Sequence, residues 1–251
     1  MVKIGNVALD NGMPKICVPI VGRTVDELVQ ECQYLQDKIY DVVELRIDFL
    51  KDVTSLDAIG EALTAVRKEL PNSALLYTFR TKEEGGELEV PEDYYFELIQ
   101  YAIKTGKVDA IDLEYFRNRD KIAETIKIAK ENGVTVVMSN HDFDKTPSYD
   151  EISERLIGMK KLGADVAKLA CMPNSAKDVL TLLSATENVK SQYPNEPIIT
   201  MSMGKLGAIS RISGEIFGSA LTFGSAKKAS APGQLEVGSP RSSLKITASA
   251  A

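Results

Sequence analysis

The pattern that most constrains the fold is a short apolar run followed by an amphipathic segment, which recurs along the 251 residues. Strands are predicted at 15–21, 42–48, 74–80, 108–114, 134–141, 164–171, 197–203 and 219–224, and helices at 24–38, 55–70, 92–104, 120–132, 149–162, 176–192 and 206–215. Eight strands alternating with helices in a chain of this length are typical of a (β/α)8 TIM barrel, an α/β fold. An open doubly wound sheet is the alternative. However, the first strand–helix turn, residues 21–24, lacks the Gly-x-Gly-x-x-Gly sequence of dinucleotide-binding sheets.

The segments outside the repeat are short, so one domain is expected over residues 1–251. An alternating run followed by Asp10-Asn11-Gly12 predicts a β-hairpin within residues 1–14. Residues 225–235 are small and polar, which favours either a lid over a site or a plain surface loop. Residues 236–251 contain glycine, proline and several serines, and are expected to form an atypical tail that is a poor helix.

Composition excludes several classes of partner. The net charge of −6 and the pI near 5.1 argue against a nucleic-acid partner. No apolar run reaches the length of about 20 residues that spans a bilayer, so no membrane partner is expected. The N-terminus does not resemble a signal peptide, and the three cysteines are widely spaced, which together predict a cytoplasmic protein. With one histidine and no Cys-x-x-Cys or His-Glu-x-x-His motif, no histidine- or cysteine-based metal site is expected.

Ionisable residues gather where the predicted strands end. They are Glu44, Arg46 and Asp48 on one face of the second strand, Arg80 after the third, Asp112 and Glu114 on the fourth, His141 on the fifth, Lys168 on the sixth and Arg211 after the seventh. Each could be an exposed strand-end charge or part of a structural ion pair. Because the catalytic residues of TIM barrels lie at the carboxyl ends of the strands, their common position predicts an active site there.

Lys168 suggests the chemistry, because it interrupts an apolar strand. A lysine held between Val166 and Ala170 would lose hydration, which lowers its pKa and favours the neutral amine that attacks a carbonyl. The alternative is a lysine that extends its ammonium out to water. The iminium formed with a ketone would activate the adjacent carbon, and His141 is the only imidazole that could remove its proton.

The remaining site residues indicate the substrate class. A carboxylate from Glu84, Asp112 or Glu114 would orient His141. Arg80 and Arg211 suit a carboxylated substrate, because guanidinium binds carboxylate in bidentate fashion. Glu44 and Arg46 can bind hydroxyl groups, and Ser230 and Gln234 could reach the substrate from the predicted lid. The site therefore favours a small, anionic, polyhydroxylated ketone.

Seven stretches carry a more specific resemblance: residues 43–48 (VELRID), 78–86 (TFRTKEEGG), 139–143 (SNHDF), 167–170 (AKLA), 201–204 (MSMG), 217–223 (FGSALTF) and 229–234 (ASAPGQ). Between about residue 15 and residue 234 the chain resembles type I 3-dehydroquinate dehydratase in order and spacing. That resemblance implies a lyase that converts 3-dehydroquinate to 3-dehydroshikimate in the shikimate pathway of aromatic amino-acid biosynthesis, without cofactor or metal.

The resemblance also implies roles for particular residues. Lys168 would form the Schiff base, His141 would be the general base and acid, and Glu84 would orient it. Substrate contacts would come from Glu44, Arg46, Arg80, Arg211, Ser230 and Gln234, with Arg211 on the carboxylate. A hairpin closing the barrel floor and a homodimer are further implications. Another Schiff-base barrel such as a class I aldolase, and a non-catalytic barrel that binds a small acid, are the alternatives.

Overall fold

The computed structural model describes residues 1–9, 12–225 and 235–236, and within them eight strands form a parallel ring. The eight strands of the ring are β3 (Lys15–Ile20), β4 (Val42–Arg46), β5 (Ala74–Thr78), β6 (Ala110–Glu114), β7 (Thr135–Asp142), β8 (Val166–Cys171), β9 (Ile198–Ser202) and β10 (Leu221–Ser225). Each pairs in parallel with the next, and β10 pairs with β3. An isolated parallel bridge joins Ile198 of β9 to Ser219, two residues before β10, and completes the ring. The (β/α)8 barrel prediction is confirmed.

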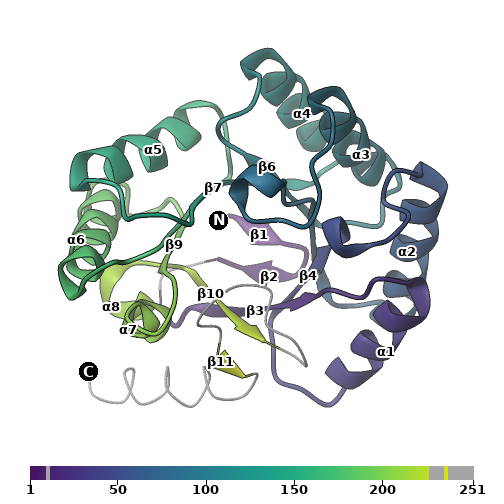
Figure 1. Ribbon diagram of the computed structural model, residues 1–251, viewed down its shortest axis with the longest axis horizontal. Helices are drawn as coiled ribbons and strands as arrows, with labels where there is room; N and C mark the ends of the chain where they lie inside the picture. The colour runs from purple at the N-terminus through teal and green to yellow at the C-terminus, as the bar shows by residue number, and fades with distance from the viewer. Residues whose placement is uncertain (10–11, 226–234, 237–251) are drawn as a thin grey trace.

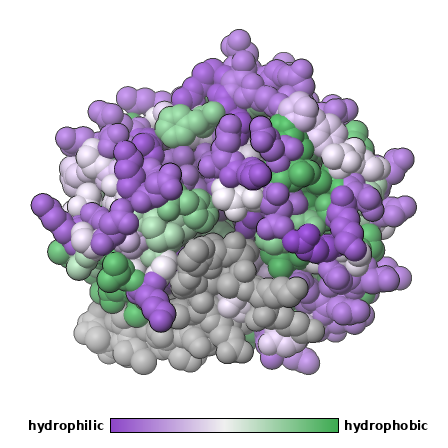
Figure 2. Space-filling view, in the orientation of Figure 1, coloured by the Kyte–Doolittle hydropathy of each residue, from purple (hydrophilic) through white to green (hydrophobic). Residues whose placement is uncertain are grey.

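Helices surround this ring, as Figure 1 shows. They are α1 (Val25–Leu35), α2 (Leu56–Glu69), α3 (Glu92–Lys104), α4 (Arg119–Glu131), α5 (Tyr149–Lys161), α6 (Ala176–Gln192), α7 (Ala208–Ile212) and α8 (Gly214–Phe217), with short 3-10 turns η1 (Ile47–Phe49) and η2 (Lys82–Glu84). Their apolar stripes pack on the outward side chains of the strands in one large buried cluster. Their outer faces are largely hydrophilic in the view of Figure 2. Every helix in the described ranges falls short of the length and apolar content that a bilayer span needs.

The helix predicted at 206–215 is in fact two short helices, α7 and α8, so that expectation is wrong in detail. The break lies at Ser213, before Gly214. A Cβ added to Gly214 would lie 2.6 Å from the carbonyl oxygen of Ser219 and 2.7 Å from a Pro14 ring carbon. A residue with a side chain would therefore not fit at the position where α8 begins.

The N-terminal hairpin is present, but its turn differs from the predicted one. Strands β1 (Lys3–Ile4) and β2 (Val7–Ala8) are antiparallel, and the turn between them is Gly5-Asn6, with Gly5 at φ 56°. Residues 10 and 11 of the predicted Asp10-Asn11-Gly12 turn lie outside the described residues. Ile4 and Leu9 are buried in the inner cluster with Val42 and Val166, which begin β4 and β8. The hairpin therefore closes the end of the barrel where the strands begin.

The ends of the predicted lid segment, residues 225–235, belong to strands. Ser225 is the last residue of β10, and Leu235 begins β11 (Leu235–Glu236), which pairs in parallel with the end of β10. Residues 226–234, with Ser230 and Gln234, and residues 237–251 of the predicted tail lie outside the described residues.

Candidate active site

Strand alternation decides which side chains enter the barrel. On β8, Val166, Lys168 and Ala170 share the inner face, and Val166 and Ala170 belong to the apolar cluster inside the ring. Apolar side chains fill the ring towards the floor, and charged ones follow towards the carboxyl ends of the strands. Lys168 is 3% exposed, so the alternative of a lysine extended to water is wrong.

The pocket at the carboxyl ends of the strands is lined by seven of the nine predicted site residues. Its lining consists of Glu44, Arg46, Arg80, Glu84, Gly85, His141, Phe143, Lys168, Ala170, Met201, Met203, Arg211 and Phe223. The other two, Ser230 and Gln234, fall in the part of the chain that the structure does not describe. The apolar residues of this lining were not predicted as site residues, although Met201 and Met203 stand two apart in the predicted strand at 197–203 and so share one of its faces.

Lys168 lies among charged groups rather than only apolar ones. Its Nζ donates to Asp112 Oδ2 at 3.0 Å, lies 3.8 Å from Glu44 Oε1, and stands 4.7 Å from the centre of the Phe223 ring. The apolar surroundings expected from Val166 and Ala170 are therefore incomplete. Glu44 belongs to β4 and Asp112 to β6. The sequence of β8 alone could not show that these two carboxylates face Lys168.

Asp112 is the countercharge at the centre of the site. Its second oxygen accepts from Arg80 Nη2 at 2.7 Å and from Ser139 Oγ at 2.5 Å. Burial would raise the pKa of Asp112, but Arg80 and then Lys168 outweigh it and hold the pKa well below its usual range. Asp112 therefore stays ionised and pairs with two cations, and it is not among the hydrogen-bond partners of His141.

Glu84 makes the contact to His141 that the resemblance implied. Its Oε2 accepts from the backbone N–H of His141 and lies 3.0 Å from Nδ1 of the ring. Asn140 Nδ2 donates to Oε1 at 3.2 Å, and Arg80 Nη1 donates to Oε2 at 3.3 Å. Because these neighbours donate N–H groups, the proton between ring and carboxylate belongs on Nδ1, and Nε2 keeps its lone pair.

Burial shifts the pKa of both His141 and Glu84. Desolvation lowers the pKa of His141 well below its usual range, and the charges of Arg80 and Lys168 lower it further, so the ring is neutral at neutral pH. Desolvation and the charge of Glu114 raise the pKa of Glu84 to about 8, while Arg80 and Asn140 act in the opposite direction. The N–H groups of Arg80, Asn140 and the His141 backbone all donate to its oxygens, which favours the ionised carboxylate. A neutral imidazole with a free Nε2 is a competent base.

The arginines differ in what surrounds them. Arg80 also donates to Glu114 at 2.9 Å, so three carboxylates lie around its guanidinium. Arg46 forms a two-fold ion pair with Asp48, which lies in η1 beyond the strand and is absent from the pocket lining. The expectation that Asp48 continues the inward face of β4 is therefore wrong, because the chain leaves the strand at Ile47. Burial lowers the pKa of Arg211, on α7, to about 10.

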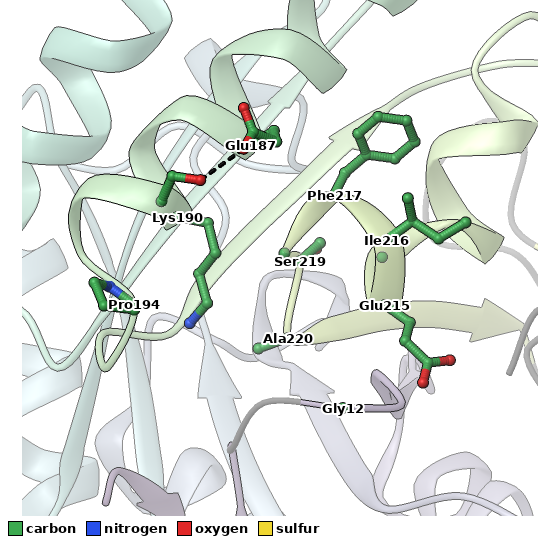
Figure 3. Close-up of a pocket in the computed structure, with 12 residues that line it drawn as sticks. Gly12, Glu187, Lys190, Pro194, Glu215, Ile216, Phe217, Ser219 and Ala220 are labelled. Carbon is green, nitrogen blue, oxygen red and sulfur yellow. Dashed lines mark hydrogen bonds between the residues drawn. The ribbon is translucent and has the colours of Figure 1, made fainter. Parts of the chain in front are cut away.

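A second cavity, of about 310 Å³, lies at the opposite end of the barrel (Figure 3). Lys190 and Glu187 from α6, Glu215 from α8, and Gly12 and Ala220, which precede β3 and β10, line it. It contains none of the predicted site residues. In the described part of the chain, no three His, Cys, Asp or Glu side chains are grouped so that they could hold a metal ion.

Comparison with known proteins decides the family. Residues 16–250 match the family described as type I 3-dehydroquinase. This chain belongs to that family. A 3-dehydroquinate dehydratase of Listeria monocytogenes is 53% identical over 245 residues, which cover 98% of this chain and 97% of the relative. One of Clostridium novyi is 51% identical over 236 residues, covering 94% of this chain and 93% of the relative.

Solved structures agree with the sequence relatives. A type I 3-dehydroquinate dehydratase of Clostridium difficile, solved with covalently modified comenic acid, superimposes with a TM-score of 0.96 at 44% identity and covers 100% of this chain and 98% of that one. One from Enterococcus faecalis gives a TM-score of 0.92 at 42% identity, covering 98% of this chain and 99% of the other. The predicted resemblance and the predicted enzyme, a type I 3-dehydroquinate dehydratase, are confirmed.

Proposed function

We propose that this chain converts 3-dehydroquinate to 3-dehydroshikimate through a Schiff base on Lys168, a step of aromatic amino-acid biosynthesis. The observation that carries the proposal is that one pocket contains both the buried amine of Lys168 and the His141–Glu84 pair. Family membership supports the substrate, and the covalent species in the Clostridium difficile structure supports covalent chemistry with a small acid in that relative.

In the first chemical step the Lys168 ammonium, paired with Asp112, passes one proton to the ketone oxygen, and the resulting neutral amine attacks the carbonyl carbon. The carbon–nitrogen bond forms, a second proton moves from nitrogen to oxygen, the oxygen leaves as water, and a protonated imine remains. Its positive charge withdraws electrons from the adjacent carbon. Nε2 of His141 then removes a proton from that carbon, and the electron pair of the carbon–hydrogen bond moves to give an enamine.

Elimination completes the reaction. The hydroxyl one carbon further on leaves as water with the proton that His141 returns, and the enamine electrons form the new carbon–carbon double bond. Water then hydrolyses the imine, which releases the enone and restores the Lys168 amine. Glu84 keeps Nδ1 protonated throughout, so that Nε2 both takes and returns the proton.

Binding of the substrate follows from the charges of the pocket. Arg211 is proposed to bind the carboxylate, because a buried guanidinium favours a bidentate anionic partner. Glu44 accepts from Thr78 Oγ1 at 3.0 Å and has further acceptor capacity for substrate hydroxyls, to which Arg46 can donate. Arg80 serves mainly to balance the carboxylates around it. Ser230 and Gln234 are proposed contacts from the lid.

The direct test is an ultraviolet assay for the conjugated enone after 3-dehydroquinate is added. We expect absorbance to rise with catalytic turnover, and Lys168→Met to lose it. An aldolase would cleave a carbon–carbon bond and yield two fragments instead, and a non-catalytic binder would yield neither product. Either result would contradict the proposal.

A single barrel domain, a homodimer and a cytoplasmic location remain predictions from the sequence and its resemblance. Sedimentation velocity at micromolar concentration measures the assembly directly. We expect a species of twice the 27.4 kDa chain mass. A single sedimenting species at the monomer mass would contradict the homodimer.

A further inference from the structure

The hydrogen bonds around His141 continue beyond Glu84 to the helix layer. Asn140, the residue before His141 on β7, is 5% exposed and donates from Nδ2 to Glu84 Oε1 at 3.2 Å. Its Oδ1 accepts from Arg155 Nη1, on α5, at 2.9 Å. A continuous chain of hydrogen bonds therefore runs from Arg155 through Asn140 and Glu84 to Nδ1 of His141.

The residue types in this chain allow only one direction of donation. The ionised Glu84 carboxylate only accepts, and the Arg155 guanidinium only donates. An amide between them satisfies both when its oxygen faces the arginine and its nitrogen faces the glutamate. Arg155 therefore fixes the orientation of the Asn140 amide, and the amide in turn fixes Glu84 Oε1.

Arg155 is itself held from two further directions. Its guanidinium carbon lies 5.3 Å from the centre of the Phe116 ring, which belongs to the segment between β6 and α4. Glu151, one turn earlier on α5, lies 4.0 Å from Nη2. The side chain is 19% exposed, so much of its length is packed. A mobile surface arginine would not be held in this way.

We propose that Arg155 and Asn140 are positioning residues for catalysis: they hold Glu84 in place, and through it keep Nδ1 of His141 protonated and Nε2 available as the base. The inference rests on the proposed function, because it assigns a role within the same reaction. Neither residue lines the pocket, so both act through Glu84 rather than on the substrate.

The pH dependence of the reaction should report this role. The charged groups that face Glu84 are Arg80 after β5, Asp112 and Glu114 on β6, and His141 on β7. The Asn140 amide and Arg80 lower the pKa of Glu84 and so favour its ionised form. Burial and the charges of Glu114 and Asp112 raise that pKa. Without the amide, Glu84 takes up a proton at higher pH, and a protonated Glu84 no longer holds the proton on Nδ1.

The experiment compares Asn140→Leu, Arg155→Met and the rescue variant Arg155→Lys with the unmodified protein. We expect kcat to fall about tenfold in Asn140→Leu and about threefold in Arg155→Met, near the low end of effects found for outer hydrogen-bond partners of metal-bound histidines. KM should stay unchanged, and the acid limb of the kcat/KM profile should move to higher pH in both. Arg155→Lys keeps a donor for Oδ1 and should recover most of kcat.

Arg119→Met is the matched control. Arg119 also stands over a ring, 4.3 Å from the centre of Tyr115, and donates to the Tyr115 carbonyl, but it is exposed and has no contact with Asn140. Its kcat and pH profile should equal those of the unmodified protein. Thermal unfolding midpoints identify any variant that is misfolded, and Asn140→Asp, which keeps the size and still accepts from Arg155, replaces Asn140→Leu in that case.

Borohydride reduction with 3-dehydroquinate separates failure of this inference from failure of the proposed function. If the unmodified protein gives neither adduct nor enone, the proposed function fails. If it gives both, the Asn140 and Arg155 variants should still form the Lys168 adduct while turnover falls. An unchanged acid limb in folded Asn140 and Arg155 variants, or a loss expressed only in KM, would overturn the positioning role.

Discussion

His141 depends on its neighbours for the tautomer that catalysis needs. Glu84 Oε2 binds both the backbone N–H and Nδ1 of this residue, so ring position and protonation are fixed together. Desolvation keeps the ring neutral at neutral pH. A single side chain can therefore remove one proton and return it to the leaving hydroxyl.

Replacement of the ring separates imine formation from proton transfer. We expect His141→Ala to form the borohydride-trapped adduct at Lys168 but to lose turnover by more than the ~10²–10⁴ of a single acid–base step, because the ring serves two proton transfers. Mass spectrometry of the adduct and the enone assay measure the two effects. Turnover within tenfold of the unmodified protein would rule out His141 as the base.

Asp112 makes a pH-dependent contribution to the free energy of unfolding. Because its folded pKa is lowered, the contribution is complete above the unfolded value of about 3.9 and is lost as pH falls towards the folded value. Asp112→Asn removes the one carboxylate that pairs with both Arg80 and Lys168 and should cost about 3 kcal/mol at pH 7. Urea unfolding measures the free energy of unfolding of both proteins from pH 3 to pH 8. The difference between Asp112→Asn and the unmodified protein should stay constant from pH 8 down to about pH 4 and become smaller below that.

Asp109→Asn provides the control for that series. Asp109 pairs with Arg67 at 2.9 Å, but both side chains are about a quarter exposed, 29% and 24%. Such a pair contributes at most about 1 kcal/mol. Equal losses for the two variants at pH 7 would contradict the special position of Asp112.

At the scale of elements, the loop after β5, which carries Glu84, is held in place by contacts with the end of β6. Thr81 donates its N–H and its hydroxyl to the two oxygens of Glu114, at 2.9 Å and 2.8 Å. Arg117, before α4, donates to Thr81, Glu83 and Glu114. The turn η2 therefore rests on the end of β6, which explains how a loop residue can orient His141.

Substitution of Gly85 tests whether the position of this loop matters for catalysis. It follows Glu84 with φ 85°, and a Cβ there would lie 2.2 Å from the Phe143 ring. Gly133, at φ 69° after α4, has open space around the corresponding position. Both Gly→Ala variants should lose about 1–2 kcal/mol from the left-handed backbone, but only Gly85→Ala should also lose kcat, since Phe143 or Glu84 must move. Equal kcat values for the two variants would contradict this role of the loop.

At the scale of the whole molecule, the two ends of the barrel have separate tasks. The hairpin fills the floor with Ile4 and Leu9, whereas the chemistry occupies the opposite end. Ile4→Ala should cost about 2–4 kcal/mol of unfolding free energy through the cavity it leaves, with kcat/KM unchanged at a temperature where the variant is folded. Val7→Ala, at a half-buried position of β2, is the control and should cost less. A loss of kcat/KM in folded Ile4→Ala would show that floor and site are coupled.

Periodicity in the sequence was sufficient to predict the barrel and the end at which polar residues gather. It could not predict how those residues pair, because pairing depends on which strands are neighbours across the ring. Asp112 illustrates this: it was a candidate partner for His141 but binds Lys168 and Arg80. The α7–α8 break at Ser213 and the Gly5-Asn6 turn depend on local backbone conformation, which a hydrophobic pattern does not encode.

The most direct test of the account is mass spectrometry of the protein after borohydride reduction with 3-dehydroquinate. Reduction converts an imine into a stable secondary amine, so the modified peptide identifies the nucleophile. We predict one adduct per chain on the peptide containing Lys168, and none in Lys168→Met. An adduct on another lysine, or no adduct in a preparation that produces the enone, would contradict the proposed chemistry.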